Sequence, residues 1–167
     1  GLCVFLAASL VGLARAAPAQ GASRTPRDLR LALGALALTT ALGIVLALAL
    51  SQGLPLPVAL PTLVDLHAVW AWMGWGGVLL AATSWVVVPM FQITPAYPAN
   101  FTRFWAPAAL IALGVWSFAL ITAIASLKLA LSALLLVMAS GFALQTLKLQ
   151  RNSRRSTPDA PFRAFRL

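Results

Sequence analysis

Thr62–Phe91 reads TLVDLHAVWAWMGWGGVLLAATSWVVVPMF, and this stretch decides the fold. A helix needs about 20 largely apolar residues to cross a membrane, and this stretch is longer than that. Its only ionisable residues are Asp65 and His67, and both stand near its start. The stretch therefore predicts a membrane-spanning helix that carries the single histidine of the chain close to one of its ends.

Three more stretches are apolar enough to span a membrane, namely residues 31–50, 104–127 and 128–147. The opening run, residues 1–14, is too short for a full span, and we interpret it as the end of a truncated helix. A signal peptide is the alternative, because Ala14-Arg15-Ala16 resembles a small-x-small cleavage site. The sequence therefore predicts an all-α, polytopic transmembrane bundle with four full spans and a partial one over residues 1–147, followed by a basic tail over residues 148–167.

Composition leads to the same class of protein. Of the 167 residues, 61% are hydrophobic and only 9% are charged, whereas a soluble domain carries roughly a quarter charged residues. The mean hydropathy is +0.92. These values exclude a soluble enzyme and a disordered tail, and the single cysteine, Cys3, excludes an internal disulfide.

The net charge of +9 predicts an orientation rather than a nucleic-acid partner. If the spans alternate, eleven of the twelve basic residues fall on one side and only Lys128 falls on the other. Basic residues are retained in cytoplasmic loops. We therefore expect a multi-pass protein of the bacterial cytoplasmic (inner) membrane, with the loop over residues 92–103 and the C-terminus in the cytoplasm.

His67 is the candidate cofactor ligand, because an ionisable side chain inside a span defaults to a functional hypothesis. At 100° per residue, Ala71, Gly74 and Val78 fall within about 60° of it, as do Ala81 and Ala82. This small stripe could leave room for a porphyrin ligated through the imidazole. The alternative, which spacing alone favours, is that the small residues let a neighbouring helix pack closely. We take His67, Ala71, Gly74 and Val78 as the candidate cofactor site, with His67 as the metal ligand.

Two other residues of the spans carry expectations. Asp65 lies about 160° around the helix from His67, so a direct pair is disfavoured and a helix cap or a headgroup-level carboxylate is expected. Trp105 stands at the inner edge of its span and is expected to anchor it at the membrane interface, with packing as the alternative.

The spacing of His67 and Pro89, 22 positions apart, resembles the second transmembrane helix of haem-copper oxidase subunit I. The segment from His67 to Pro98 also looks like bacterial membrane proteins related to that subunit. The resemblance implies an axial haem ligand at His67. Ala68 replaces the glycine of the oxidase pattern, and Trp85-Val86 replaces its Asn-Tyr pair.

An intact oxygen-reducing site is excluded within these residues, because no second histidine is present and no copper site is visible. We therefore expect one haem b bound through His67 for electron transfer or sensing, and not a complete oxidase. The second axial position would be filled by a missing part of the protein, a partner chain, a methionine or nothing. Met73 and Met138 are only nominal candidates, and Met73 lies about 120° around the same helix from His67 and cannot face it across a haem. The alternative is a cofactor-free, permease-like or structural membrane subunit in which His67 hydrogen-bonds another helix. The expected partners are the lipid bilayer and a partner membrane subunit or a second copy, without nucleic acid.

Overall fold

A computed structural model describes residues 2–15, 25–53 and 55–153, and every regular element within those ranges is a helix. Four helices are long and apolar enough to cross a membrane. The predicted all-α polytopic bundle is therefore confirmed. The elements are α1 (Leu2–Arg15), α2 (Thr25–Gln52), α3 (Leu60–Val69), η1 (Trp70–Gly77), α4 (Val78–Gln92), α5 (Ala99–Ile121) and α6 (Ala125–Arg151), of which α3, η1 and α4 form one continuous span.

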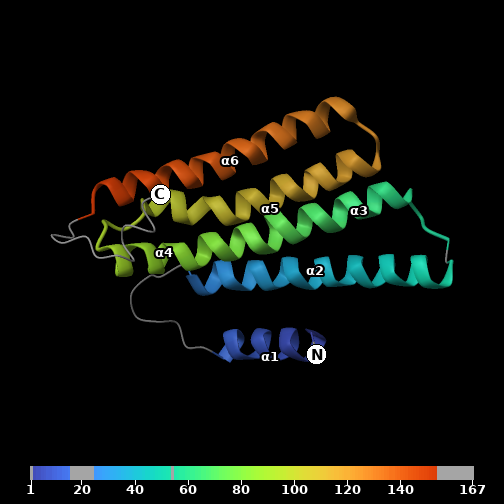
Figure 1. The fold of residues 1–167 in the computed structure, drawn as a ribbon, viewed down its shortest axis with the longest axis horizontal. Coiled ribbons are helices and arrows are strands. Elements are labelled where there is room, and N and C mark those ends of the chain that lie inside the picture. The colour runs from blue at the N-terminus through green and yellow to red at the C-terminus, as the bar shows by residue number, and fades with distance from the viewer. Residues whose placement is uncertain (1, 16–24, 54, 154–167) are drawn as a thin grey trace.

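The helices follow one another across the bundle in chain order, and successive spans run in opposite directions (Figure 1). The first turns of α2 and α5 and the last turns of α4 and α6 therefore lie together. We call this the basic end, because Arg27, Arg30, Arg103, Lys148 and Arg151 lie there among the described residues. The opposite end carries Lys128. The shorter α1 packs against α2 outside the four spans.

Helix ends differ from the predicted ones by several residues. The second helix begins at Thr25 rather than at residue 31, and α6 continues to Arg151. Lys148 and Arg151 are therefore helical, although we expected them in the tail. The basic residues of the tail beyond Ser153 and the linker over residues 16–24 lie outside the described residues.

The connection between α5 and α6 was predicted near Lys128 but lies at residues 122–124. Ala123 takes a left-handed conformation with φ 56°, and the backbone N–H of Ile124 donates to the carbonyl of Ala119 at 3.0 Å. This turn contains neither glycine nor proline and lies within an uncharged, largely apolar run. Hydropathy therefore does not mark the position of the turn, and Lys128 falls in the first turn of α6 rather than in the connection.

The central part of the second of the four spans is a π-helix, η1, in which hydrogen bonds join residues five apart. It directs Trp70 inward, where its indole N–H donates to the hydroxyl of Ser117 at 2.9 Å. It directs Trp72 outward, where 82% of the residue is exposed. The 100° per residue used to align His67 with Gly74 and Val78 holds only for α-helix, so that alignment does not describe η1.

The main core cluster gathers where α4, α5 and α6 meet, close to the basic end. Trp105 is buried there, and its indole N–H donates to the carbonyl of Met138 at 3.0 Å. The expectation that Trp105 anchors the span at the membrane interface was therefore wrong. An indole satisfied by a neighbouring helix contributes to packing rather than to contact with headgroups.

Candidate functional site

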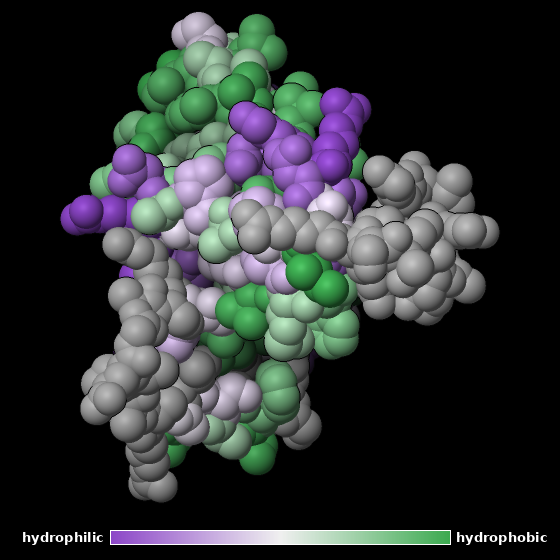
Figure 2. Space-filling view, turned by 90° about the vertical axis from the view of Figure 1, so that its left-hand side faces the viewer, coloured by the Kyte–Doolittle hydropathy of each residue, from purple (hydrophilic) through white to green (hydrophobic). Residues whose placement is uncertain are grey.

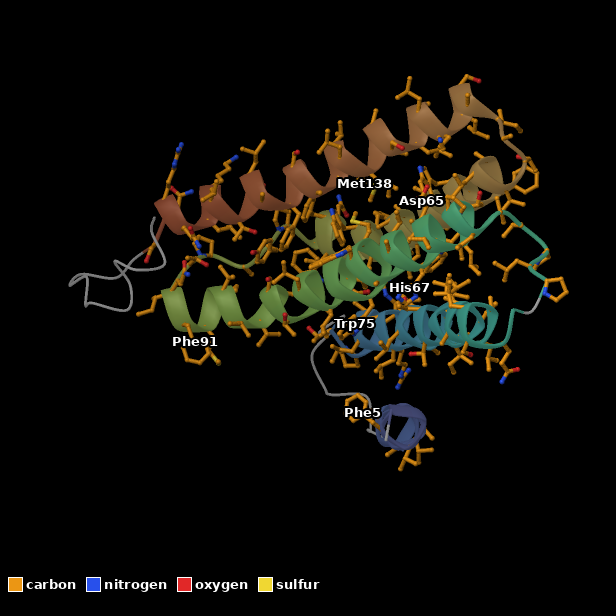
Figure 3. The ribbon with its side chains drawn as sticks, turned by 45° about the vertical axis from the view of Figure 1, so that its right-hand side comes forward. Phe5, Asp65, His67, Trp75, Phe91 and Met138 are labelled. Atoms are coloured by element: carbon orange, nitrogen blue, oxygen red, sulfur yellow. The ribbon has the colours of Figure 1, made fainter. Side chains whose placement is uncertain are left out.

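His67 lies on α3 and points to α2. Its Nδ1 lies 3.0 Å from the backbone carbonyl oxygen of Thr39. A carbonyl only accepts hydrogen bonds, so Nδ1 must carry the proton and Nε2 keeps an unprotonated lone pair in the neutral ring. Figure 3 shows His67 between the two helices. The histidine is therefore a hydrogen-bond donor that connects two neighbouring spans.

Gly43 lets α2 approach the imidazole closely. A Cβ atom at position 43 would lie 3.0 Å from Cε1 of His67 and 3.5 Å from its Nδ1. The 3.0 Å contact is tighter than ordinary packing, so the ring would have to shift by a few tenths of an ångström. The absence of a side chain at Gly43 thus makes room for the ring, and the sequence places a glycine one helical turn beyond Thr39, the residue that accepts the hydrogen bond.

The rest of the predicted stripe is packed against neighbouring helices. A Cβ at Gly74 would lie 2.9 Å from Trp70, 3.2 Å from Leu113 of α5 and 3.4 Å from Ala35 of α2. Val78 is fully buried. Ala81 and Ala82 are fully buried as well, and Ala71 is half-buried.

A porphyrin laid along this stripe does not fit the residues present. The donor chemistry of His67 suits haem, because a ligating histidine ordinarily donates its other ring N–H to a carbonyl or carboxylate. The space does not suit haem, because Ala35, Leu113 and Trp70 already occupy the surface of Gly74. The small residues serve close helix packing in this arrangement.

Asp65 does not join His67. It is exposed, and Figure 3 shows it on the side of α3 away from His67. It does not cap the helix either, because α3 begins at Leu60 with Ala59 as its N-cap and no side-chain cap bond. The capping expectation was wrong because the helix begins earlier, with Pro61 in its first turn. Proline is favoured in a first turn, because an N–H there has no helical acceptor and its absence costs no hydrogen bond.

A second polar site, which the sequence analysis missed, lies around Asp28 at the basic end. This carboxylate is fully buried. Its Oδ1 accepts from Nε and one terminal nitrogen of Arg27, at 2.9 and 2.8 Å, and its Oδ2 accepts from the indole N–H of Trp85 at 3.0 Å. Asp28 thereby connects the first turn of α2 to α4. Only three acidic residues occur in the chain, and an acid beside an arginine at the edge of an apolar run was the available signal.

Arg27 extends this site to α5. Its terminal nitrogen also donates to the backbone carbonyls of Arg103, at 2.9 Å, and Thr102, at 3.3 Å. In an uninterrupted helix the Arg103 carbonyl would accept from the N–H of residue 107, but Pro107 has none. The guanidinium therefore satisfies a carbonyl that a proline leaves without its helical partner.

Aromatic rings surround the far side of Trp85. Its ring packs edge-on against those of Tyr97 and Phe142, with centroids 4.7 and 5.7 Å away, and against Phe101 and Trp105. Tyr97 lies in the connection between α4 and α5, and its hydroxyl is 2.9 Å from that of Thr146. Burial raises the pKa of Tyr97 above its usual value, although the Thr146 hydrogen bond opposes this shift. The site is a packed network of hydrogen bonds and rings.

Within the described residues, no group of three or more His, Cys, Asp or Glu side chains comes together. Met73 and Met138, the nominal second haem ligands, both pack against the core cluster around Trp85.

Comparisons with protein-family models, with curated proteins and with solved structures found no match for this chain. The resemblance to oxidase subunit I therefore stays a prediction from the residues between His67 and Pro98.

Proposed function

We propose that this chain is a structural, packing subunit of an integral membrane assembly, and that His67 joins α2 to α3 by a hydrogen bond without holding a cofactor. The observation that carries the proposal is the 3.0 Å contact from Nδ1 to the Thr39 carbonyl, made over Gly43. Both polar sites use their groups to connect helices. Hydrogen bonds of this kind are a common means of holding membrane helices together.

The charges support an orientation in a bacterial inner membrane. Figure 2 views the basic end of the bundle and shows hydrophilic side chains gathered there among apolar ones. Basic residues are retained on the cytoplasmic side. We therefore place the basic end, including the last turn of α6, in the cytoplasm, and His67 in the outer half of the membrane.

Two features favour a partner within the membrane. Only 6% of the apolar window of α6 is buried. Trp72 is 82% exposed and lies well inside its span, far from the interfacial level that tryptophan prefers. A partner subunit or a second copy packed on these surfaces would cover them, and lipid would cover what remains.

Haem at His67 is the second candidate, and the contact of Nδ1 with the Thr39 carbonyl favours it, because in the neutral ring this contact leaves the lone pair of Nε2 available to a metal. A haem subunit related to oxidases would use that nitrogen as a ligand and act in electron transfer or sensing. The packed stripe beside Gly74 weighs against it, because α2 and α5 would have to separate to admit the ring.

Substitution by asparagine separates the two candidates. The amide nitrogen of asparagine occupies the place of Nδ1 and can still donate to Thr39, but asparagine has no counterpart of Nε2. The full chain would be purified in detergent from cells with ample haem, as wild type, His67→Asn and His67→Ala. We expect no b-type band in the reduced-minus-oxidised spectra.

Stability is the second measurement in this experiment. His67→Asn should unfold close to the wild type, whereas His67→Ala should lose about 1–3 kcal/mol, since it removes the donor and opens a cavity. A sharp b-type band in the wild type that disappears in His67→Asn would overturn the proposal and establish the haem candidate.

A further inference from the structure

A groove of about 290 Å³ lies between α6 on one side and α3 with η1 on the other. The helix α5 runs between these two walls and contributes Trp116 to the groove (Figure 1). The lining is apolar apart from Ser132, whose hydroxyl accepts from the indole N–H of Trp116 and donates to the carbonyl of Lys128. The groove is therefore an apolar surface whose hydroxyl already has partners within the chain.

The groove runs parallel to the spans. Ser132 and Ala139, which both line it, are seven residues apart on α6, which corresponds to about 10 Å of helix. Leu136 and Ala139 of the same wall are exposed, so the groove is open to the surrounding membrane. An acyl chain of the bilayer lies in the same direction as the spans. The groove therefore has the polarity and the direction of a site for one acyl chain.

Two charges of opposite sign stand on the two walls, at the end of the bundle opposite the basic end. Both α3 and α6 begin at this end (Figure 1). Asp65 stands four residues before Val69, which lines the groove on α3. Lys128 stands four residues before Ser132, which lines it on α6. Because residues four apart share a helix face, an acid and a base flank the groove one turn beyond its lining.

The charges of Asp65 and Lys128 are not compensated within the part of the chain that the structure describes. The ion pair found there joins Arg27 to Asp28 at the basic end. Asp65 and Lys128 are both exposed, and their side chains have no bonding partner among the described residues. Charged side chains within spans almost always pair, and Asp65 lies about 7–8 Å inside the start of α3. A ligand that carries both an ammonium and an anion would pair with both residues.

We propose that this groove binds one acyl chain of a zwitterionic phospholipid with a primary amine, whose ammonium donates to Asp65 and whose phosphate accepts from Lys128. Charge complementarity selects this occupant, because a purely anionic headgroup would bring a second negative charge to Asp65. A choline headgroup has the positive charge but no N–H to donate. An exposed ion pair contributes up to about fivefold in affinity. The inference does not depend on His67, which faces α2.

The test uses the full chain in a maltoside detergent. The probes are phosphatidylethanolamine, phosphatidylcholine and phosphatidylglycerol with identical acyl chains, and bound lipid is counted by native mass spectrometry. The wild type should retain phosphatidylethanolamine about fivefold better than phosphatidylcholine. Asp65→Asn should remove this preference while still binding lipid. Lys128→Gln should weaken the binding of both lipids about fivefold and keep the preference.

A third variant tests the groove itself. Ala139→Phe, which places a ring in the groove, should lose the bound lipid. Its control is Ala130→Phe, because Ala130 is exposed on the same helix but does not line the groove. This control should bind lipid as the wild type does.

Several results would overturn the proposal. Equal retention of phosphatidylethanolamine and phosphatidylcholine by the wild type is one, and a preference that survives Asp65→Asn is another. Equal binding by Ala139→Phe and Ala130→Phe would show that the groove is not the site. Tighter binding of phosphatidylglycerol than of phosphatidylethanolamine would contradict the choice of headgroup. A dimer that Asp65→Asn or Lys128→Gln dissociates would show that a second copy, and not a lipid, pairs with these charges.

Discussion

Replacing Arg27 by methionine tests the polar site at the basic end most severely. Methionine keeps the apolar stem but offers no donor to Asp28 or to the Arg103 carbonyl. Removing one partner of a buried ion pair costs about 3–5 kcal/mol, because the other charge stays buried. Asp28 is fully buried, but the side chain of Arg27 is 42% exposed and partly screened by water. We therefore expect Arg27→Met to lower the free energy of unfolding by about 3 kcal/mol, at the low end of that range.

A double-mutant cycle with Pro107 isolates the bond to the carbonyl. Pro107→Ala restores an N–H that can occupy the Arg103 carbonyl, so Arg27→Met should then cost about 1 kcal/mol less, the net worth of one hydrogen bond. The assay is reversible unfolding in mixed micelles, followed by circular dichroism. Lys148→Met, an exposed charge removed at the same end, should change stability by less than about 0.5 kcal/mol. Equal losses of stability from Arg27→Met and Lys148→Met would refute the reasoning. A loss from Arg27→Met that is the same with proline and with alanine at position 107 would refute it too.

Two further predictions concern packing and pH. Gly74→Ala should lower stability by about 1–3 kcal/mol, since its Cβ would press on Trp70 and Leu113. The control, Gly114→Ala, should raise stability by up to about 1 kcal/mol through helix propensity. Thermal unfolding in detergent measures both variants, and a Gly74→Ala protein as stable as the wild type would contradict the packing described at Gly74. Burial raises the pKa of Tyr97 in the folded protein above the ordinary 10.0, so its neutral form stabilises the fold below that pH and the contribution is lost as the pH rises through the folded pKa. Tyr97→Phe should therefore lose less stability than the wild type above pH 10, and parallel pH profiles of the two proteins would disprove this.

The sequence predicted the class of fold because hydropathy and span length are physical requirements of a bilayer. It failed at the α5–α6 turn, because Ile121 to Ile124 are not marked by charge, glycine or proline. The left-handed Ala123 is held by the packing of two long helices rather than by its own preference. Hydropathy alone cannot locate such a turn.

The candidate site was predicted in part. The small residues from Gly74 to Ala82 indicated either a cofactor or a close helix, and the structure places them against other helices. The π-helix could not be derived from a periodicity that assumes α-helix. The Asp28 site depends on Trp85, 57 positions away in the chain, and pairing at that distance requires knowledge of how the spans pack. The bond from Arg27 to the Arg103 carbonyl, which Pro107 leaves without its helical partner, likewise joins residues far apart in the chain.

The single histidine of the chain permits a direct test of the central claim, that His67 donates through Nδ1 to the Thr39 carbonyl. Protein labelled with ¹⁵N only in histidine, and purified with a histidine-free tag, would give one pair of ring-nitrogen signals by NMR at neutral pH. The account predicts a protonated Nδ1 and a bare Nε2 with no bound iron. A proton on Nε2 with a bare Nδ1, or signals broadened and shifted by a haem iron, would contradict it.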